Sequence, residues 1–268
     1  RVVAELVRGP YARPVQVPKP DCLKDHVFTF ALRRMQDLLT DTHRDAWKLG
    51  NENDDGLVRK FPTEKNPTAD SKWFYHQKLL TFPDLIKKHG LDTSRYEDFL
   101  RANSFITERA VEFVLPYIEA LDEQLPGYAF LRNLRDANHV LRLIIDDPPS
   151  VTNNLEVTST HTHLAFCTLH VWANRPEFQW YNEEYKQWER VVEHTETPSA
   201  LFFLGRKAAL MTGGKRKIAP DGEQSKEVVP HSGILQPLLH RVREIGATHE
   251  LTTPRLAVVI FFHVPLVL

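Results

Sequence analysis

The chain has 268 residues, 42% of them hydrophobic and 26% charged, which is typical of a globular protein with one large domain or two small ones. Its net charge of −1 excludes the excess of basic residues found in most binders of nucleic acid and anionic membranes, so we expect neither partner. Two cysteines, Cys22 and Cys167, are too few for a disulfide framework and indicate a reducing, cytoplasmic compartment. No apolar run reaches the length of a membrane-spanning helix, and the first residues show no signal-peptide pattern.

The first half of the chain has the patterns of helices and loops. Four prolines within residues 1–20 predict an extended arm. Asp21 is a candidate cap for a helix that we expect to run to about Trp47, with an apolar stripe at helical spacing. The polar residues at 50–67, with Gly and Pro among them, predict a loop. The aromatic cluster at 72–76 predicts either an edge of the core or a pocket wall.

A second, longer helix is predicted before Pro126-Gly127. Ser94 and Glu97 have the spacing of a capping box, and apolar residues then recur at helical spacing as far as Leu125. Pro116 lies within this pattern, where it predicts either a kink or the first turn of a new helix. Pro126-Gly127 predicts the end of the helix.

From Val140 onward the pattern changes to short apolar runs separated by turns, which predicts strands. We expect strands over 140–145, 157–172, 177–181, 187–193, 200–205 and 256–264. Residues 213–237 are charged and contain Asp221-Gly222, which predicts a turn in a loop that either covers a site or is simply solvated. Helices followed by strands predict an α+β fold, with a double-stranded β-helix (jelly-roll) core over residues 138–268 and N-terminal supporting helices within residues 1–137. We expect these two segments to form one integrated domain.

Two histidines stand one residue apart at the start of an apolar run, in Thr160-His161-Thr162-His163-Leu164. Side chains at positions i and i+2 of a strand point to the same face, so both imidazoles are expected to reach one point. A third candidate, His240, lies downstream in Leu239-His240-Arg241-Val242. Imidazole binds iron, copper, zinc and nickel, so these histidines predict a metal site.

Several blocks of the second half occur in an order that carries a resemblance. They are Leu141-Arg142-Leu143 with Pro148-Pro149, His161-Thr162-His163 with Thr168-Leu169, Phe178-Gln179, Trp188-Glu189-Arg190-Val191, Gly205 with Leu210-Met211-Thr212-Gly213-Gly214, His240-Arg241-Val242, and Arg255-Leu256-Ala257. Together they resemble the C-terminal half of the Fe(II)/2-oxoglutarate dioxygenase superfamily, in the branch of isopenicillin N synthase and the plant oxygenases. The resemblance covers roughly residues 138–264.

Three positions depart from the pattern of that family. His163 stands where the family has a metal-binding carboxylate, and Ala257 stands where it has the serine of an Arg-x-Ser pair. The segment 144–147 holds no tyrosine, although the family has one there. The resemblance implies His161, His163 and His240 as metal ligands, unless His163 turns aside. It implies Arg255 as the anchor for the far carboxylate of 2-oxoglutarate.

The resemblance implies a non-haem oxygenase that oxidises a small organic substrate with O2, with Fe(II) as its metal and 2-oxoglutarate as co-substrate. Three neutral imidazoles leave a divalent ion with its full charge, which makes Cu or Zn alternative metals. Two other readings stay open: a metal oxygenase whose substrate chelates the three-His metal directly without 2-oxoglutarate, and a non-catalytic relative of the fold. A halogenase-like centre is disfavoured, because His163 is larger than the small residue that makes room for a halide. Cys167, His170 and His263 are expected in the core, although Cys167 on a regular strand would approach the metal.

Overall fold

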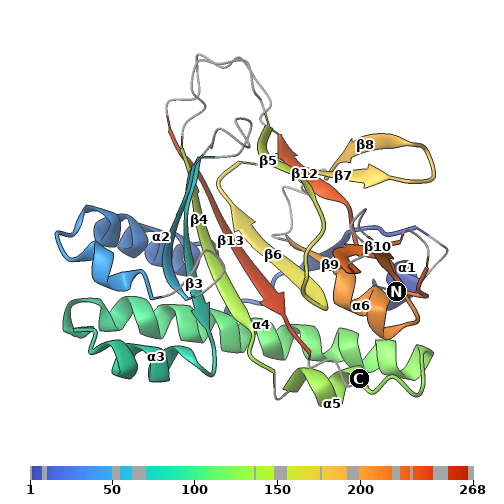
Figure 1. The fold of residues 1–268 in the computed structure, drawn as a ribbon, viewed down its shortest axis with the longest axis horizontal. Coiled ribbons are helices and arrows are strands. Elements are labelled where there is room, and N and C mark those ends of the chain that lie inside the picture. Colours follow the sequence, from blue (N-terminus) through green and yellow to red (C-terminus); the bar gives the residue numbers. More distant parts are fainter. Residues whose placement is uncertain are drawn as a thin grey trace.

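Two large antiparallel β-sheets, a two-stranded ribbon and the helices beneath the larger sheet make up the computed structural model (Figure 1). The structure describes residues 2–7, 11–49, 55–61, 71–135, 137–147, 156–175, 177–191, 199–218, 224–229, 232–243 and 253–264. The predicted α+β fold is confirmed, since two antiparallel sheets and a set of supporting helices are present.

The larger sheet has seven strands in the order β1-β9-β6-β13-β4-β3-β2, and all neighbouring pairs are antiparallel. Its strands are β1 (Val15–Pro18), β9 (Ser199–Leu204), β6 (Cys167–Ala173), β13 (Arg255–Phe262), β4 (Val140–Asp146), β3 (Lys72–Lys78) and β2 (Gly56–Lys60). Strands β1, β2 and β3 come from the first half of the chain, so both halves build the same sheet.

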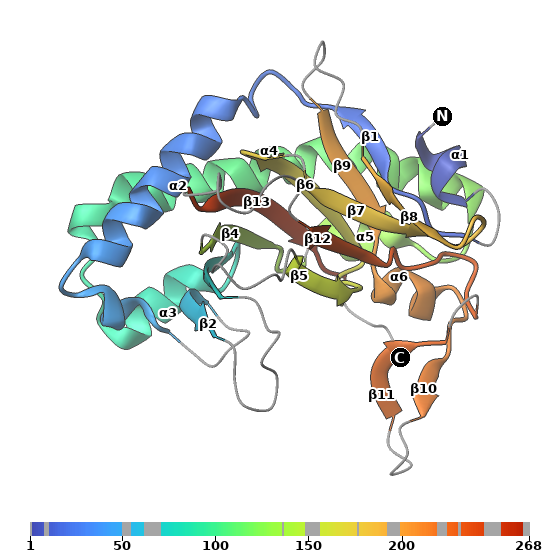
Figure 2. The ribbon, with the colours of Figure 1, turned by 90° about the horizontal axis from the view of Figure 1, so that it is seen from above.

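The smaller sheet has four strands in the order β5-β12-β7-β8. Its strands are β5 (Glu156–His161), β12 (His240–Arg243), β7 (Phe178–Asn182) and β8 (Gln187–Arg190). A separate ribbon of β10 (Arg216–Ile218) and β11 (Gln224–Val228) projects away from both sheets (Figure 2). This ribbon occupies part of the predicted charged loop, and the turn predicted at Asp221-Gly222 lies outside the described residues.

Strand β13 shows why the central strands of the larger sheet are apolar along their length. Val258 and Ile260 belong to the main hydrophobic core, together with residues of the helices. Val259 and Phe261 point to the opposite face and pack with Ala165 in a second apolar cluster. Successive side chains of a strand alternate between the two faces, so β13 is buried on both. The face opposite the helices is the one that carries the candidate site.

Helices cover the other face of the larger sheet, and the longest of them, α4 (Glu97–Gln124), runs beneath it (Figure 1). Its buried apolar side chains recur at helical spacing: Phe99, Ile106, Ala110, Val114, Ile118 and Leu121. The other helices are α1 (Val2–Val7), α2 (Asp25–Thr40), α3 (Phe82–His89), α5 (Phe130–Arg135) and α6 (Arg206–Met211), with 3₁₀ turns η1 (Arg44–Trp47) and η2 (Ser94–Tyr96). Helix α4 continues through Pro116, so no new helix begins there.

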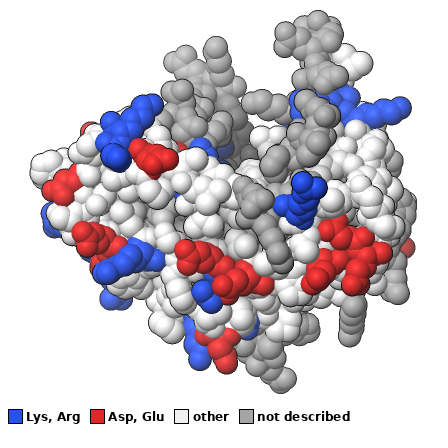
Figure 3. All heavy atoms as spheres, turned by 90° about the horizontal axis from the view of Figure 1, so that it is seen from below, with Lys and Arg blue, Asp and Glu red and all other residues white. Residues whose placement is uncertain are grey.

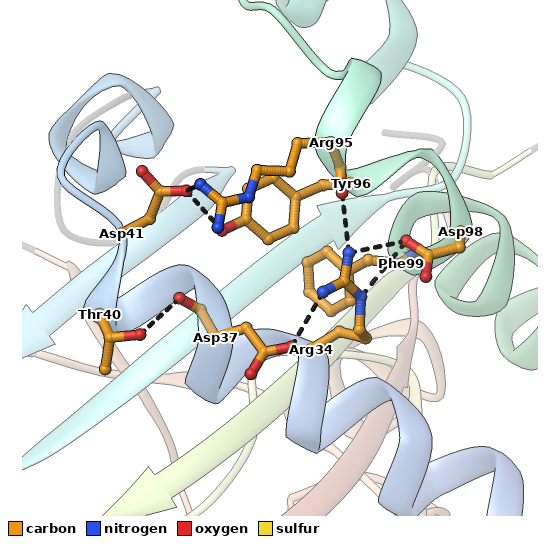
Figure 4. Close-up of polar contacts among 8 residues, drawn as sticks. All are labelled: Arg34, Asp37, Thr40, Asp41, Arg95, Tyr96, Asp98 and Phe99. Atoms are coloured by element: carbon orange, nitrogen blue, oxygen red, sulfur yellow. Dashed lines mark hydrogen bonds and ion pairs between the residues drawn. The ribbon is translucent and has the colours of Figure 1, made fainter.

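Polar contacts fix the end of α2 against the start of α4 (Figure 4). The Arg34 guanidinium donates to the Asp98 carboxylate at 3.0 Å and to the backbone carbonyl of Arg95 at 2.7 Å. The Asp41 carboxylate, one residue past α2, accepts from the Tyr96 hydroxyl at 2.7 Å and pairs with the Arg95 guanidinium at 3.0 Å. These contacts join elements that lie more than fifty residues apart in the chain.

Several predictions for the first half of the chain are wrong in detail. The arm begins with helix α1, and the first long helix begins at Asp25 and ends at Thr40, short of Trp47. Strand β2 lies inside the predicted loop 50–67. Ser94 does not cap α4, because it lies in the preceding 3₁₀ turn η2 and Tyr96 occupies the N-cap position. The predicted end of α4 is confirmed, with Gly127 at a φ of +104° just past it.

In the second half, the strand predicted over 157–172 is two strands in different sheets. β5 ends at His161 and belongs to the smaller sheet, whereas β6 begins at Cys167 and belongs to the larger one. Residues 162–166 connect them without strand structure. His161 and His163 therefore do not share one face of a single strand, contrary to the prediction, although their rings still converge.

Charged side chains of both signs are interspersed over the face of the molecule seen from below (Figure 3). This mixture agrees with the net charge of −1. Among the described helices, none is both long enough and apolar enough to cross a membrane.

Candidate metal centre

Three imidazoles meet between the two sheets. His161 ends β5, His240 begins β12, and His163 lies in the connection that leads to β6. The Nε2 atom of His163 lies 3.1 Å from Nε2 of His161 and 3.1 Å from Nε2 of His240. One nitrogen from each ring lies within 4.8 Å of the other two. His161 and His240 are also directly paired across the antiparallel strands β5 and β12.

The spacing of these nitrogens fits one bound ion. Imidazole nitrogens bind a first-row metal at about 2.0–2.1 Å, which places neighbouring ligands about 2.9–3.4 Å apart in octahedral or tetrahedral geometry. Both Nε2 separations, at 3.1 Å, fall within that range. The donor set is therefore compatible with a single metal ion.

Hydrogen bonds orient two of the rings so that Nε2 is the ligand atom. Nδ1 of His240 lies 3.1 Å from the backbone carbonyl of Leu238, so it carries the proton and donates it. Nδ1 of His163 lies 2.9 Å from the hydroxyl of Thr168, the second residue of β6. A metal-binding imidazole ordinarily uses its second nitrogen in this way. The Leu238 carbonyl fixes the tautomer of His240 and leaves its Nε2 with a lone pair, and the Thr168 hydroxyl orients the ring of His163.

Backbone contacts with the start of α6 hold the connection that carries His163. The N–H of Arg206 donates to the His163 carbonyl at 2.8 Å, and the N–H of Gly205 donates to the Phe166 carbonyl at 2.8 Å. A Cβ atom on Gly205 would lie 2.1 Å from the carbonyl oxygen of Ala165. Glycine at this position is what lets the two segments approach closely enough to place His163.

Aromatic side chains surround the histidines. Phe178 of β7 stacks on His240 with ring centroids 5.1 Å apart, and Phe203 of β9 contacts the same ring at 5.0 Å. Phe261 of β13 meets His163 edge to face at 4.7 Å. Burial in this apolar setting lowers the pKa of both His163 and His240 well below the ordinary value. Both imidazoles are therefore neutral at physiological pH, the form that binds metal.

Arg255 lies in a buried network of ion pairs at the start of β13. Its guanidinium is 2.9 Å from the Asp146 carboxylate and 3.4 Å from that of Glu177. Asp146 also pairs with Lys72 at 3.3 Å, and Glu177 with Arg175 at 3.2 Å. Arg255 and Asp146 are each almost fully buried. Arg255 thus already has two carboxylate partners from the chain itself.

Space next to Arg255 is small. The cavity beside it has a volume of about 20 Å³ and is lined by His170, Phe178 and Glu177 among others, which is room for about one water molecule. Ala257, two residues along the same face of β13, contributes no hydroxyl. Asp146, which faces Arg255 across the strands, lies in the segment where the resembling family has a tyrosine. A dicarboxylate at Arg255 would have to displace these carboxylates.

The three residues expected in the core, and Arg241 next to His240, lie away from the metal ligands or have structural contacts. Cys167 is fully buried in the main core on the face opposite the histidines. His170 faces the interior beside Phe178, and burial lowers its pKa to about 3. His263 follows β13, and burial lowers its pKa to about 4. Arg241 donates to a side chain of the neighbouring strand β7 at 2.8 Å and therefore has a structural contact on the smaller sheet.

Sequence reasoning missed several residues of the centre. Thr168, Phe178, Phe203 and Phe261 all contact the histidines, yet each reads in the sequence as an ordinary strand residue. Every second side chain of β6 and β13 faces the histidines. Thr168 and Phe261 could be identified from this alternation only once the strand register was known. Asp146 carried a signal in the sequence, since an acidic residue at the end of an apolar strand needs a buried partner.

Solved structures with the same fold cover nearly the whole chain, whereas no family model and no curated protein sequence matches it. A 2OG-Fe(II) oxygenase family protein of Caulobacter crescentus has a TM-score of 0.70 at 16% identity, over 98% of this chain and 80% of that one. AtDAO1 of Arabidopsis thaliana, a dioxygenase for auxin oxidation solved with 2-oxoglutarate, has a TM-score of 0.63 at 13% identity, over 99% and 87%. JOX2, solved with 2OG, Fe and JA, has a TM-score of 0.63 at 14% identity, over 98% and 70%. At such identities the likeness establishes the fold, that of the 2-oxoglutarate/Fe(II) oxygenases.

Proposed function

We propose that the protein is a non-haem metal oxygenase that oxidises a small organic substrate with O2 at a centre held by His161, His163 and His240. The observation that carries this proposal is the convergence of the three Nε2 atoms inside a fold shared with structures of oxygenases. Fe(II) at this position would supply the electrons through which dioxygen becomes reactive toward an organic substrate.

The chain's own residues prepare the centre in three ways. The carbonyl of Leu238 and the hydroxyl of Thr168 hold two of the rings with Nε2 inward. Phe178, Phe203 and Phe261 pack against the rings of His163 and His240 and give the centre an apolar wall. Three neutral imidazoles bring no negative charge, so an ion there keeps its full +2 charge and favours an anionic ligand.

Two forms of this function compete, and they differ in the use of 2-oxoglutarate. In the first, Arg255 anchors 2-oxoglutarate, a ligand with which AtDAO1 and JOX2, two proteins of the same fold, were solved. In the second, the substrate binds the metal directly and no 2-oxoglutarate is used. The pairing of Arg255 with Asp146 and Glu177, and the small cavity beside it, favour the second form.

Oxygen uptake by anaerobically Fe(II)-loaded protein, with and without 2-oxoglutarate, separates these forms. If Arg255 anchors the co-substrate, 2-oxoglutarate should bind only in the presence of metal, and slow oxygen uptake with succinate release should follow even without substrate. The metal-dependent binding of 2-oxoglutarate and the oxygen uptake should both vanish in His240→Ala. Both should persist in His89→Ala, which changes an exposed histidine on α3. Stoichiometric metal binding without 2-oxoglutarate binding supports the second form, and the absence of metal binding rejects the proposal.

A further inference from the structure

Arg142 lies on the inward face of β4, close to the metal centre. It is paired across the sheet with His76 of β3 and with Val259 of β13, whose side chain faces the interior. The ring of Phe261 contacts both the Arg142 guanidinium, at 4.6 Å, and the imidazole of His163, at 4.7 Å. One aromatic ring therefore lies in contact with both the arginine and a proposed metal ligand.

The guanidinium of Arg142 is held rigidly by its neighbours. Its Nε donates to Nε2 of His76 at 2.7 Å, and its planar group lies over the rings of Phe74, at 4.8 Å, and Phe261. Stacking on aromatic faces and one fixed hydrogen bond orient the two terminal nitrogens as a fork. Such a fork matches the two oxygens of a carboxylate.

No carboxylate of the described residues pairs with Arg142, unlike the other cations beside it. Burial lowers its pKa to about 10, so the group remains charged at neutral pH. The two carboxylates nearby are already bound by other cations. Asp146, four residues along the same strand from Arg142, is paired with Lys72 and Arg255.

An open pocket of about 360 Å³ lies at the start of β4. Val140, two residues before Arg142 on the same face of β4, forms part of its wall, together with Lys78, Lys207 and His263. Lys207 pairs with no acidic side chain in the part of the chain that the structure describes. Lys78 already pairs with Asp55 at 3.1 Å, and burial lowers the pKa of His263 to about 4, so Lys207 is the cation of this lining that can attract an anion.

We infer that Arg142 binds a carboxylate of the organic substrate, so the protein acts on organic acids. This inference rests on the proposed function and adds the class of substrate to it. Arg142 would hold the acid by two hydrogen bonds while the rest of the molecule lies toward the metal across Phe261. Arg255 does not compete for this role, because Asp146 and Glu177 already neutralise it.

Binding of a panel of monocarboxylic acids tests this inference. Acetate, benzoate and 3-phenylpropanoate are each compared with the corresponding neutral amide by calorimetry, on both metal-free and zinc-loaded protein. At least one acid should bind ten or more times more tightly than its amide. Arg142→Gln should bring that ratio close to one, and Arg142→Lys should restore only part of it, because lysine keeps the charge but lacks the fork. Arg33→Gln, an exposed control on α2, should leave the ratio unchanged.

The arms of this experiment distinguish failure of the inference from failure of the proposed function. If wild-type protein binds zinc but no acid of the panel, or if the acid-to-amide ratio survives in Arg142→Gln, the inference is overturned and the metal centre stands. If acids bind through Arg142 in a protein that takes up no metal, the carboxylate site stands and the oxygenase proposal falls. Loss of 2-oxoglutarate binding in Arg142→Gln, matching that of the acids, would assign Arg142 to the co-substrate and overturn the substrate assignment.

Discussion

At the scale of single residues, the imidazole of His163 changes the charge of the candidate centre. A carboxylate at this position would reduce the net charge of a bound divalent ion from +2 to +1, and imidazole does not. The larger ring fits without turning aside, since Thr168 binds its Nδ1 and both other histidines lie 3.1 Å from its Nε2. The consequence for metal choice follows from ligand preference, because imidazole favours Cu(II) and Zn(II) over Fe(II).

Replacing His163 by aspartate should shift metal preference toward Fe(II). The wild type should bind Zn(II) or Cu(II) at least as tightly as Fe(II), and His163→Asp should lower the Zn(II)/Fe(II) affinity ratio by about tenfold or more, since a carboxylate is the harder ligand. Anaerobic competition titrations measure this ratio, with His89→Asp as an exposed control. A wild type that strongly prefers Fe(II), or a ratio unmoved by the substitution, would contradict the three-imidazole assignment.

Asp146 is expected to have two opposing effects, one on stability and one on ligand binding. Asp146→Asn removes a carboxylate that pairs with both Lys72 and Arg255 in the interior. We expect the free energy of unfolding to fall by about 3–5 kcal/mol, because two buried cations lose the carboxylate that they share and Arg255 keeps only Glu177. The affinity of the metal-loaded protein for 2-oxoglutarate should rise, since Arg255 becomes available to a ligand carboxylate.

Denaturant unfolding and calorimetry on the same preparations measure the two effects of this substitution. Asp84→Asn, at an exposed position of α3, is the control. Loss of stability without any gain in 2-oxoglutarate affinity would show that Arg255 is a structural residue alone.

At the scale of elements, the site depends on how short segments are anchored more than on regular secondary structure. His163 lies outside any strand and is placed by hydrogen bonds from Gly205 and Arg206 at the start of α6. The helical layer is fixed in a similar way, where Asp41 after α2 receives hydrogen bonds from the Tyr96 hydroxyl and the backbone of His43. Such contacts are what the local sequence patterns did not predict.

The Asp41 contacts predict a particular dependence of stability on pH. The hydrogen bond from the backbone of His43, then that from Tyr96, lower the pKa of Asp41 to about 2, against about 3.9 in an unfolded chain. A lowered folded-state pKa means that the ionised form stabilises the fold. This contribution is complete above about pH 5, declines between about pH 4 and pH 2, and is absent below.

Unfolding of wild type and Asp41→Asn between pH 7 and pH 3 tests this dependence. The variant should be less stable at pH 5–7, and the difference should shrink as the pH falls toward 3. Asp21→Asn, at a fully exposed carboxylate, should show no such trend. A difference that stays constant over this range would show that Asp41 acts through packing and not through its charge.

At the scale of the whole molecule, the order of helices and strands was predictable, because apolar residues recur at a different spacing in helices and in strands. The strands β4, β7, β9 and β13 lie within one or two residues of their predicted positions. Strand β2 was not predictable, because its five residues lie beside a polar stretch and pair only with β3 among the described strands. The break between β5 and β6 was also not predictable, because the connection between them contains apolar residues that resemble a continuing strand.

Only part of the candidate site could be predicted from the sequence. His161 and His240 could be placed from the order of the sequence blocks, and each lies at the end or the start of a strand. The partners of Arg255 and the fork of Arg142 could not, because they depend on which strands are neighbours in the larger sheet. Long-range pairing of this kind leaves no local pattern in the chain.

X-ray absorption spectroscopy of the zinc-loaded protein tests the central claim most directly, because it counts the imidazole ligands of the bound ion and measures their distances. The three-histidine centre predicts one ion per chain with three imidazole nitrogens at about 2.0–2.1 Å, reduced to two in His163→Phe. A wild-type spectrum with two or fewer imidazoles, or one unchanged in His163→Phe, would contradict the three-histidine centre.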